Sequence, residues 1–222
     1  MTSLTETKGR TRRGGRGAGK RILNAASELF YCEGINATGV GRIASNASVS
    51  KRTLYQHFPS KTALVEEYLR QLREEAGEDE SALAQKSDAT PRAQLLALFD
   101  HADGDDARMR GCPFHNAAVE ASGAMPGVEH IVHLHKRAYV DGLIKLAREA
   151  GAGDPEMLGN HPALFYEGAS ALSTSLNDPA PRPRARAAAE ALISMCCRRQ
   201  HRVVDRGWRD CDDGFLGATD EI

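Results

Sequence analysis

The spacing of the apolar residues constrains the fold most strongly, because it follows the helical repeat along nearly the whole chain. The first clear segment carries apolar residues three and four positions apart, at Ile22, Ala25, Ala26, Leu29 and Phe30. Gly34 then supplies the residue that most readily ends a helix. No segment shows the alternation of polar and apolar residues that a half-buried strand requires. The sequence therefore predicts an all-α fold of about nine helices.

Residues 20–66 carry the pattern of three short helices followed by the start of a longer one. The second stripe comprises Val40, Ile43, Ala44 and Ala47, and the third Val49, Leu54, Tyr55 and Phe58. Thr38 stands near the N-cap of the second helix. Pro59 ends the third helix, and Ser60 can cap the next. We expect these helices to bury one small core between them.

The remaining sequence divides into a larger helical region and two terminal segments. Residues 1–19 are predicted to be a disordered basic arm, residues 67–200 a second helical domain, and residues 201–222 a poorly ordered or add-on tail. Thr90 and Pro91 predict a capped helix start. Pro162 is expected to break or kink its helix. The last helix has an expected packing face at Ala188, Ala191, Leu192 and Met195.

Charge is distributed unevenly along the chain, although the formal net charge is only -1. Residues 1–60 contain ten Lys and Arg against three acidic residues, whereas the rest of the chain carries an excess of acid. A basic N-terminal module on an acidic remainder is typical of a protein whose small module meets a polyanion. The basic arm either follows a phosphate backbone or minor groove, or serves as a solubilising tail.

The segment NASVSKRTLYQHFPSK, residues 46–61, combines a sparse apolar skeleton with many polar groups suited to DNA. The skeleton fits two helices that cross through a tight turn, with small alanines at the contact. Outside it stand Ser48, Ser50, Lys51, Arg52, Thr53, Gln56 and His57. Cations can bind phosphate or the guanine edge, Gln can pair with adenine, and hydroxyls can reach either. This division predicts a recognition helix.

The run ELFYCEGINATGVGRIASNASVSKRTLYQHFPSKTALVEEYL resembles the DNA-binding domain of the tetracycline-repressor (TetR) family of transcriptional regulators, over about residues 20–70. The resemblance rests on the elements IA, TLYQHF and SKTAL in register. It implies DNA contacts from Thr38, Ser50, Lys51, Arg52 and Thr53, and backbone contacts from Tyr55, His57 and Lys61. Gln56 completes the DNA-binding set that we predict.

Two positions depart from the family pattern. Ser48 stands where the family usually has Gly, so a left-handed backbone there would cost about 1 kcal/mol. Arg52 stands where a small residue is frequent, and it adds a cation for guanine or phosphate. Structural roles compete with DNA contact at several positions: Tyr55 can belong to the core, His57 can cap or pack, and Lys51 with Arg52 can be a solvated pair.

The resemblance implies that the C-terminal helices bind a ligand and dimerise. Candidate pocket residues are Phe99, Met109, Phe114, Tyr139, Leu143, Phe165 and Tyr166, with His115, Asn116 and His135 as polar anchors. Ordinary core packing is the alternative for the aromatic residues. We expect a homodimer formed by helices around Pro162–Asn177 and Pro183–Cys197. Its small-residue face comprises Gly168, Ala169, Ala171, Leu172 and Ser175.

The predicted function is a sequence-specific DNA-binding transcriptional regulator, namely a repressor that an apolar or amphipathic small molecule releases from a palindromic double-stranded operator. Alternatives are a metal-responsive regulator using His130, His133 and His135, a redox-responsive one using Cys112 or Cys196 and Cys197, and an effector-independent DNA-binding protein. The sequence contains no recognisable catalytic motif, cofactor motif or metal-ligand cluster, so we expect neither an enzyme nor a bound cofactor or metal. Without a membrane span or secretory leader, a cytoplasmic protein is expected.

Overall fold

The computed structural model describes residues 17–86, 90–100 and 110–197, which contain nine helices and no strand. The side chains of Ala76 and of residues 78–86 lie outside this description, as do the predicted arm up to residue 16 and the tail from residue 198. In the described part of the chain, no helix is long and apolar enough to cross a membrane. The prediction of an all-α fold is confirmed.

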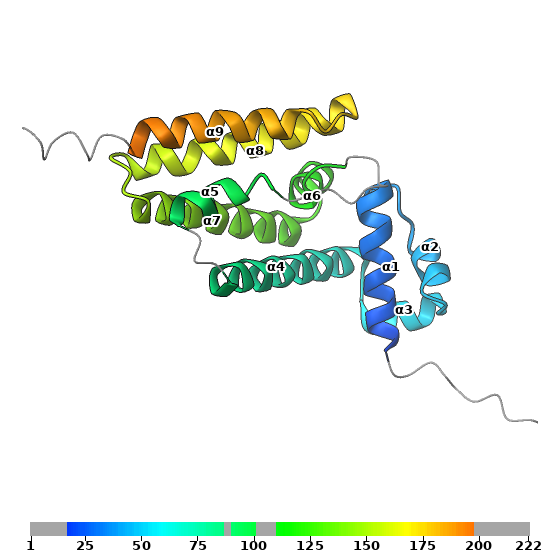
Figure 1. The fold of residues 1–222 in the computed structure, drawn as a ribbon. Helices are drawn as coiled ribbons and strands as arrows, with labels where there is room; N and C mark the ends of the chain where they lie inside the picture. The colour runs from blue at the N-terminus through cyan, green and yellow to red at the C-terminus, as the bar shows by residue number, and fades with distance from the viewer. Residues whose placement is uncertain (1–16, 87–89, 101–109, 198–222) are drawn as a thin grey trace, which may run out of the picture.

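The first three helices form a compact head at one end of the molecule (Figure 1). They are α1 (Ala18–Glu33), α2 (Val40–Asn46) and α3 (Lys51–His57). Helix α1 begins two residues earlier than predicted, at Ala18, and ends at Gly34 as predicted, with a φ of 99°. Its predicted apolar stripe is buried at all five positions, because this face packs against α2, α3 and α4.

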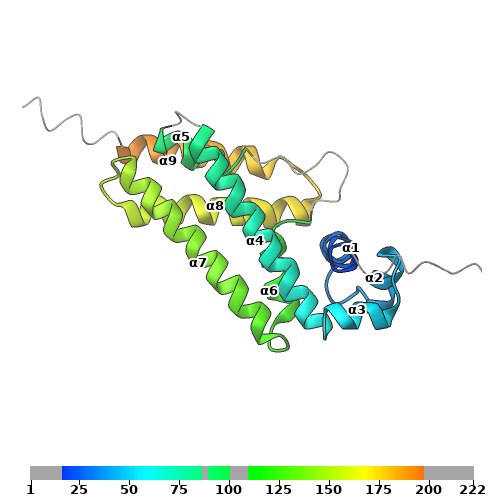
Figure 2. The ribbon, with the colours of Figure 1, turned by 90° about the horizontal axis from the view of Figure 1, so that it is seen from below.

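Helix α4 (Lys61–Lys86) leaves the head and runs alongside α7 (Pro126–Glu149), as Figures 1 and 2 show. The remaining helices are α5 (Pro91–Ala97), α6 (Pro113–Ala121), α8 (Pro155–Leu176) and α9 (Pro181–Cys197). Helices α8 and α9 pack side by side on the outer side of α7. The predicted domain boundary between residues 66 and 67 falls inside α4, so this helix belongs to the head and to the larger region together.

Capping residues explain several of the helix starts. Thr90 accepts a hydrogen bond from the backbone N–H of Ala93, with Pro91 at the first helical position, as predicted for α5. Asp154 caps α8 by accepting from the N–H of Met157 at 2.9 Å. Of the break or kink expected at Pro162, the break is absent, because α8 is continuous from Pro155 to Leu176. Pro162 is fully buried, and packing against neighbouring helices compensates for the one backbone donor it lacks.

Two apolar cores hold the helices together. The first contains the head residues together with Phe114, Ala117 and Ala121 of α6 and the start of α7. The head therefore does not bury a separate core of its own, which corrects the expectation from sequence. The second core joins α5, the C-terminal half of α7, α8 and α9. Because the buried face of α6 packs in the first core together with the head residues, a displacement of α6 also shifts residues of the head.

Within a single chain, most residues of the packing face predicted for α9 are exposed. Pro181, Ala189 and Ile193 are the buried residues of α9, and Leu192 is partly buried. Ala188, Ala191 and Met195 point away from the chain's own core. The apolar pattern of this helix is broad enough to fit either face, and contact with α8 selects the one that is buried.

Candidate nucleic-acid interface and effector site

A tight turn joins α2 to α3 in the head. Ser48 adopts a left-handed backbone with a φ of 53°, and the N–H of Val49 donates to the carbonyl of Ala44 at 2.9 Å. Ser48, which stands where the family usually has Gly, therefore does adopt the left-handed conformation. This conformation has a steric cost for any residue that has a Cβ. Arg21 of α1 donates through Nε to the carbonyl of Ala47 at 3.2 Å and ties the turn to the first helix. Nothing in the local sequence pattern indicated this role for Arg21.

Helix α3 separates an apolar face from a polar one. Leu54 is fully buried, and Val49 and Phe58 pack partly against the first core. The opposite side exposes Ser50, Lys51, Arg52, Tyr55, Gln56 and His57, with Thr53 half-buried beside them. Six of the nine predicted DNA-binding residues are therefore exposed on α3 or at its N-cap. We call this set the reading surface: Ser50, Lys51, Arg52, Tyr55, Gln56 and His57. A surface of this kind can enter a major groove while Leu54 keeps the helix seated.

Several polar groups of the reading surface also support the helix. The Ser50 hydroxyl caps α3 by accepting from the N–H of Thr53 at 3.0 Å, and it lies 2.9 Å from the Thr53 hydroxyl. A Cβ placed on Gly41 would come within 3.0 Å of Cε of Lys51, so the Lys51 stem lies against α2. Glycine at position 41 thus leaves room for the cation.

Tyr55 and His57 of α3 lie in different environments. Tyr55 is 47% exposed, which favours a surface role over the core role that the sequence left open. His57 is exposed, and its ring lies against the first turn of α1, where a Cβ on Gly19 would stand 3.3 Å from Nδ1. His57 can pack against α1 and contact a phosphate at the same time.

Thr38 is not available to DNA through its side chain. It is fully buried, and its hydroxyl donates to the carbonyl oxygen of Gly34 at 2.7 Å, with that of Leu29 at 3.3 Å. Gly39, rather than Thr38, is the N-cap of α2. A small polar residue before an apolar stripe is typical of a cap, but here the chain turns back on α1 and buries the hydroxyl.

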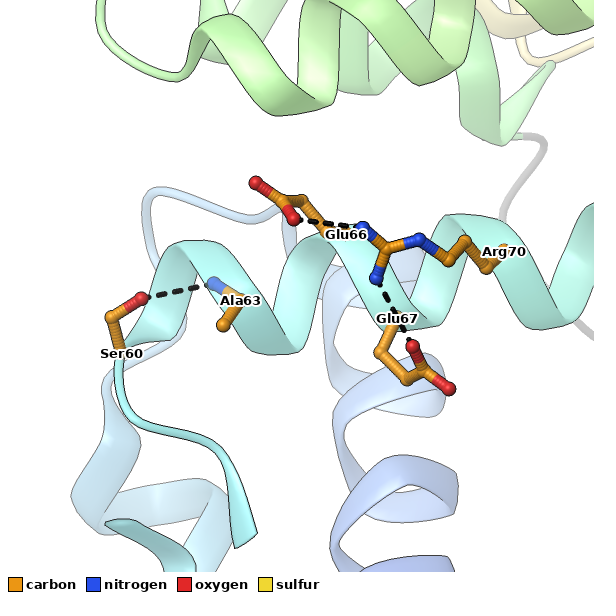
Figure 3. Close-up of polar contacts among 5 residues, drawn as sticks. All are labelled: Ser60, Ala63, Glu66, Glu67 and Arg70. Atoms are coloured by element: carbon orange, nitrogen blue, oxygen red, sulfur yellow. Dashed lines mark hydrogen bonds and ion pairs between the residues drawn. The ribbon is translucent and has the colours of Figure 1, made fainter.

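Lys61 stands at the N-terminus of α4, where Ser60 caps the helix by accepting from the N–H of Ala63 at 3.0 Å (Figure 3). Lys61 is half-buried, and its burial lowers the pKa of the ammonium group while the nearby Glu120 carboxylate opposes that change. Further along α4, Arg70 binds Glu66 at 2.9 Å and Glu67 at 3.1 Å (Figure 3). Both carboxylates pair with Arg70, and the Glu66 side chain also lies against Gly127 of α7.

Two cavities lie where α6 meets α8 and the head. The larger has a volume of about 350 Å³ and is lined by Tyr31, Tyr68, Leu72, Gly111, Cys112, Pro113, Tyr166 and Arg182. The smaller, of about 180 Å³, is lined by Gly111, Cys112, His115, Asn116, Glu167, Ser170, Ala171, Thr174 and Ser175. We call them the large and the small cavity. Gly111 and Cys112 belong to both.

Only three of the ten predicted ligand-binding residues line these cavities, namely His115, Asn116 and Tyr166. Phe99 and Leu143 are buried in the second core, against which Tyr139 and Phe165 also pack. Phe114 is buried in the first core and stacks on His135, with ring centroids 3.6 Å apart. Met109 lies outside the described residues. The spacing of aromatic residues along a helix does not show whether they face the core or a cavity. For this reason most of the predicted ligand-binding residues lie in the cores instead.

Charged groups gather beside the small cavity. The ammonium group of Lys136 lies 3.4 Å from Sγ of Cys112 and forms an ion pair with Glu167. Burial opposes the charge on Lys136, but Cys112 and Glu167 together raise its pKa above the ordinary value for lysine. Burial and the neighbouring Lys136 and Arg73 lower the pKa of His135 to about 4. In the described residues, no group of three His, Cys, Asp or Glu side chains could hold a metal ion.

Short hydrogen-bonded links connect this cavity region to the head. The Tyr31 hydroxyl donates to the carbonyl of Gly111 at 3.4 Å, and Arg110 donates through Nε to the carbonyl of Tyr31 at 3.0 Å. At the other end of α6, Glu120 accepts from the N–H of Asn36 at 2.7 Å. Helix α6 is thus fixed to α1 at its start and to the loop after α1 at its end.

Comparison with known proteins gives matches that agree with this geometry. Residues 22–68 match the family model of bacterial regulatory proteins, tetR family. The HTH-type transcriptional activator FasR of Mycolicibacterium smegmatis is 38% identical over 91 residues, which are 38% of this chain and 40% of FasR. The HTH-type transcriptional regulator UidR of Escherichia coli is 41% identical over 56 residues, 25% of this chain and 29% of UidR. These matches thus span less than half of the curated relatives.

The likeness extends over the whole fold in a solved structure. SCO4454, a TetR-family transcriptional regulator from Streptomyces coelicolor, is 30% identical. The alignment covers 81% of this chain and 96% of SCO4454, with a TM-score of 0.71.

Proposed function

This chain belongs to the TetR family of DNA-binding transcriptional regulators, and we propose that it acts as a homodimeric repressor that a small-molecule effector releases from a palindromic operator. In this proposal, residues 20–66 bind DNA and residues 67–200 bind the effector and dimerise. The reading surface of α3 carries the proposal, because it presents two adjacent cations and several hydrogen-bonding groups on a helix seated by Leu54.

Dimerisation supplies the second recognition helix. One such helix reads too few base pairs for useful specificity, whereas a two-fold dimer reads two half-sites about 34–36 Å apart, or a multiple of that distance. The outer faces of α8 and α9 support this arrangement. Leu164, Leu172, Leu176 and Met195 are each more than half exposed. Apolar side chains of this size on one pair of helices are typical of a protein interface.

Small residues surround these apolar side chains and permit close helix packing. Gly168, Ala171 and Ser175 of the predicted face are exposed on α8, and Ala188 and Ala191 are exposed on α9. Ala169 faces inward and is 4% exposed, so we leave it out of the proposed interface. The two helices from each protomer would form a four-helix interface.

Effector control is proposed to act through α6. A ligand in the cavities contacts the start of α6, and the far end of this helix is hydrogen-bonded to the head at Asn36. The effector must bind one separation of the two heads better than the other, and a tenfold release requires about 1.4 kcal/mol of coupling. The relative FasR is named an activator, and transcription from a promoter that carries the operator distinguishes activation from repression.

Selection of bound DNA from random sequence tests the DNA-binding proposal. We expect one two-fold symmetric sequence, bound with an affinity that falls steeply as salt is raised. Equal affinity for all sequences would contradict a sequence-specific regulator. A promoter carrying the selected site, transcribed with and without the protein, then shows whether binding represses or activates.

Sedimentation of a Leu172→Arg variant tests the interface. A buried unpaired cation destabilises an apolar interface, so this variant should be monomeric and should bind the palindrome more weakly. Val119→Arg is the matched control, because Val119 is 65% exposed on α6, outside α8 and α9. A Leu172→Arg variant that stays dimeric would show that the interface lies elsewhere.

A further inference from the structure

Cys112 combines three properties that the proposed regulatory function does not explain. It lines both cavities, its thiol is partly accessible, and the Lys136 ammonium group lies 3.4 Å from its sulfur. The pairing of Lys136 with Glu167 holds this cation in place. An ammonium group at this distance can donate a hydrogen bond to the sulfur and can also supply a proton to a molecule that reacts there.

The lining of the small cavity also includes a serine whose hydroxyl group has no hydrogen-bond partner among the described residues. This serine, Ser170, is only 3% exposed. A buried hydroxyl without a partner is costly, and a bound ligand with an acceptor oxygen would remove that cost. Ser170 lines the same cavity as Cys112, so one small molecule can meet both groups.

We propose that the effector is an α,β-unsaturated carbonyl compound that becomes covalently attached to Cys112, an inference that rests on the proposed function. The carbonyl oxygen accepts a hydrogen bond from Ser170, and this bond draws electron density from the conjugated double bond. The apolar part of the compound occupies the large cavity, whose walls include Tyr68, Leu72 and Tyr166. In this arrangement the small cavity holds the polar portion of the ligand and the large cavity holds its apolar portion.

The reaction is a conjugate addition in which no group leaves and no external oxidant or reductant is needed. The thiolate sulfur of Cys112 forms a bond to the β-carbon, and the π electrons of the double bond move to give an enolate. The enolate α-carbon then takes a proton from the Lys136 ammonium group. Lys136 regains a proton from solvent, to which the thiol first released its own, so the net change is addition of S–H across C=C.

An adduct at this position must disturb the start of α6. Gly111, directly before Cys112, has a φ of 71°, and a Cβ there would come within 2.8 Å of Oγ1 of Thr174 on α8. The backbone at the start of α6 therefore lies close against α8, so we expect an adduct that fills the cavities beside Cys112 to shift α6 relative to α8. Ala171 and Ser175 of the small cavity also belong to the proposed dimer face, so the partner subunit would form one wall of the site.

The test treats the full-length protein with methyl vinyl ketone and measures the rate of modification of each cysteine by peptide mass spectrometry. Cys32 is exposed on α1, outside the lining of either cavity, and serves as an internal reference in the same molecule. We expect Cys112 to react at least about tenfold faster than Cys32. Lys136→Met should lower the rate at Cys112 and leave the rate at Cys32 unchanged. Butan-2-one, which lacks the double bond, should form no adduct.

Operator affinity is measured before and after treatment. The affinity of the wild type and of Cys32→Ser should fall at least tenfold, whereas that of Cys112→Ser should stay at its own untreated value. Equal reaction rates at Cys112 and Cys32, or a Cys112 adduct that leaves operator affinity unchanged, would overturn the proposal. Failure of the proposed function is a separate result, because the untreated protein would then select no DNA sequence while the cysteine rates could still be measured.

Discussion

The carboxylate of Glu120 accepts a hydrogen bond from the backbone N–H of Asn36 at 2.7 Å, and the Asn36 side-chain amide donates to the carbonyl of Glu120 at 3.0 Å. These reciprocal bonds join the C-terminal turn of α6 to the loop between α1 and α2. Gly34, with its positive φ, lets the loop pass close to Glu120, since a Cβ there would stand 3.2 Å from the carboxylate. Through this link α6 joins the cavities to the head, in addition to α4, whose Tyr68 and Leu72 line the large cavity.

Removing the Glu120 carboxylate should weaken operator binding. In Glu120→Leu the head loses a bond worth about 0.5–1.5 kcal/mol, which corresponds to a reduction in operator affinity of up to about tenfold. Glu120→Gln keeps an oxygen acceptor for the Asn36 N–H and should bind like the wild type. Fluorescence anisotropy with the selected operator measures the difference. Equal affinities for both variants would show that the link does not orient the head.

Replacing Lys51 and Arg52 by Ala should abolish specific operator binding without unfolding the protein. Both residues are exposed on α3, so thermal unfolding should be nearly unchanged. For each phosphate that the variant no longer neutralises, the slope of log affinity against log salt should fall by about 0.9. Arg148→Ala, an exposed cation near the end of α7, is the control and should retain full affinity. Unchanged affinity of the double variant would refute the placement of the reading surface.

Thr38→Val should lower stability and leave DNA binding by the folded protein intact. The substitution keeps the buried volume but removes the donor to the Gly34 carbonyl, at a cost of about 1–3 kcal/mol. Thr38→Ser keeps the hydroxyl and should lose less stability. Denaturant unfolding measures both variants. If instead Thr38→Val unfolds like the wild type and loses operator affinity, the side chain contacts DNA as the family resemblance implies.

Ser48→Gly should raise stability, because a left-handed backbone is strained for a residue with a Cβ and unstrained for glycine. After the larger chain entropy of unfolded glycine is subtracted, we expect a gain of about 0.5–1 kcal/mol. That gain corresponds to a rise in Tm of about 2–4 °C per kcal/mol. Ser48→Val is the opposite control and should lower Tm, since a β-branched residue tolerates this backbone poorly. A lower Tm for the glycine variant would mean that the serine is not strained.

Acid should destabilise the protein in part through His135. Its pKa is lowered in the folded state to about 4 by burial, Lys136 and Arg73, whereas an unfolded histidine titrates near 6.5. The unfolded chain therefore binds the proton first, so this contribution to stability is complete above pH 6.5 and is lost as the pH falls towards 4. His135→Phe preserves stacking on Phe114 and removes the titration. Between pH 6.5 and 4, its Tm should fall less steeply than that of the wild type, and parallel curves would contradict this prediction.

The head was largely predictable from the sequence because its determinants are local. The stripe from Ile22 to Phe30, the cap at Ser60 and the seat provided by Leu54 all follow from spacing and residue type, and the structure contains each of them. Thr38 was the exception. A short polar residue before a helix can cap it or fold back onto the preceding helix, and the two outcomes differ only in tertiary contact.

The sequence by itself determined that the chain is helical, where α1 ends, where α4 and α5 begin, and which side of α3 is polar. These properties depend on neighbours within one or two turns. Only the tertiary structure decided that Cys112, Lys136 and Glu167 meet, since they lie on α6, α7 and α8 or at their ends. It also decided which predicted ligand residues are core and which line a cavity. The packing of the helices sets these long-range contacts, and a periodic apolar stripe carries no information about the partner that will cover it.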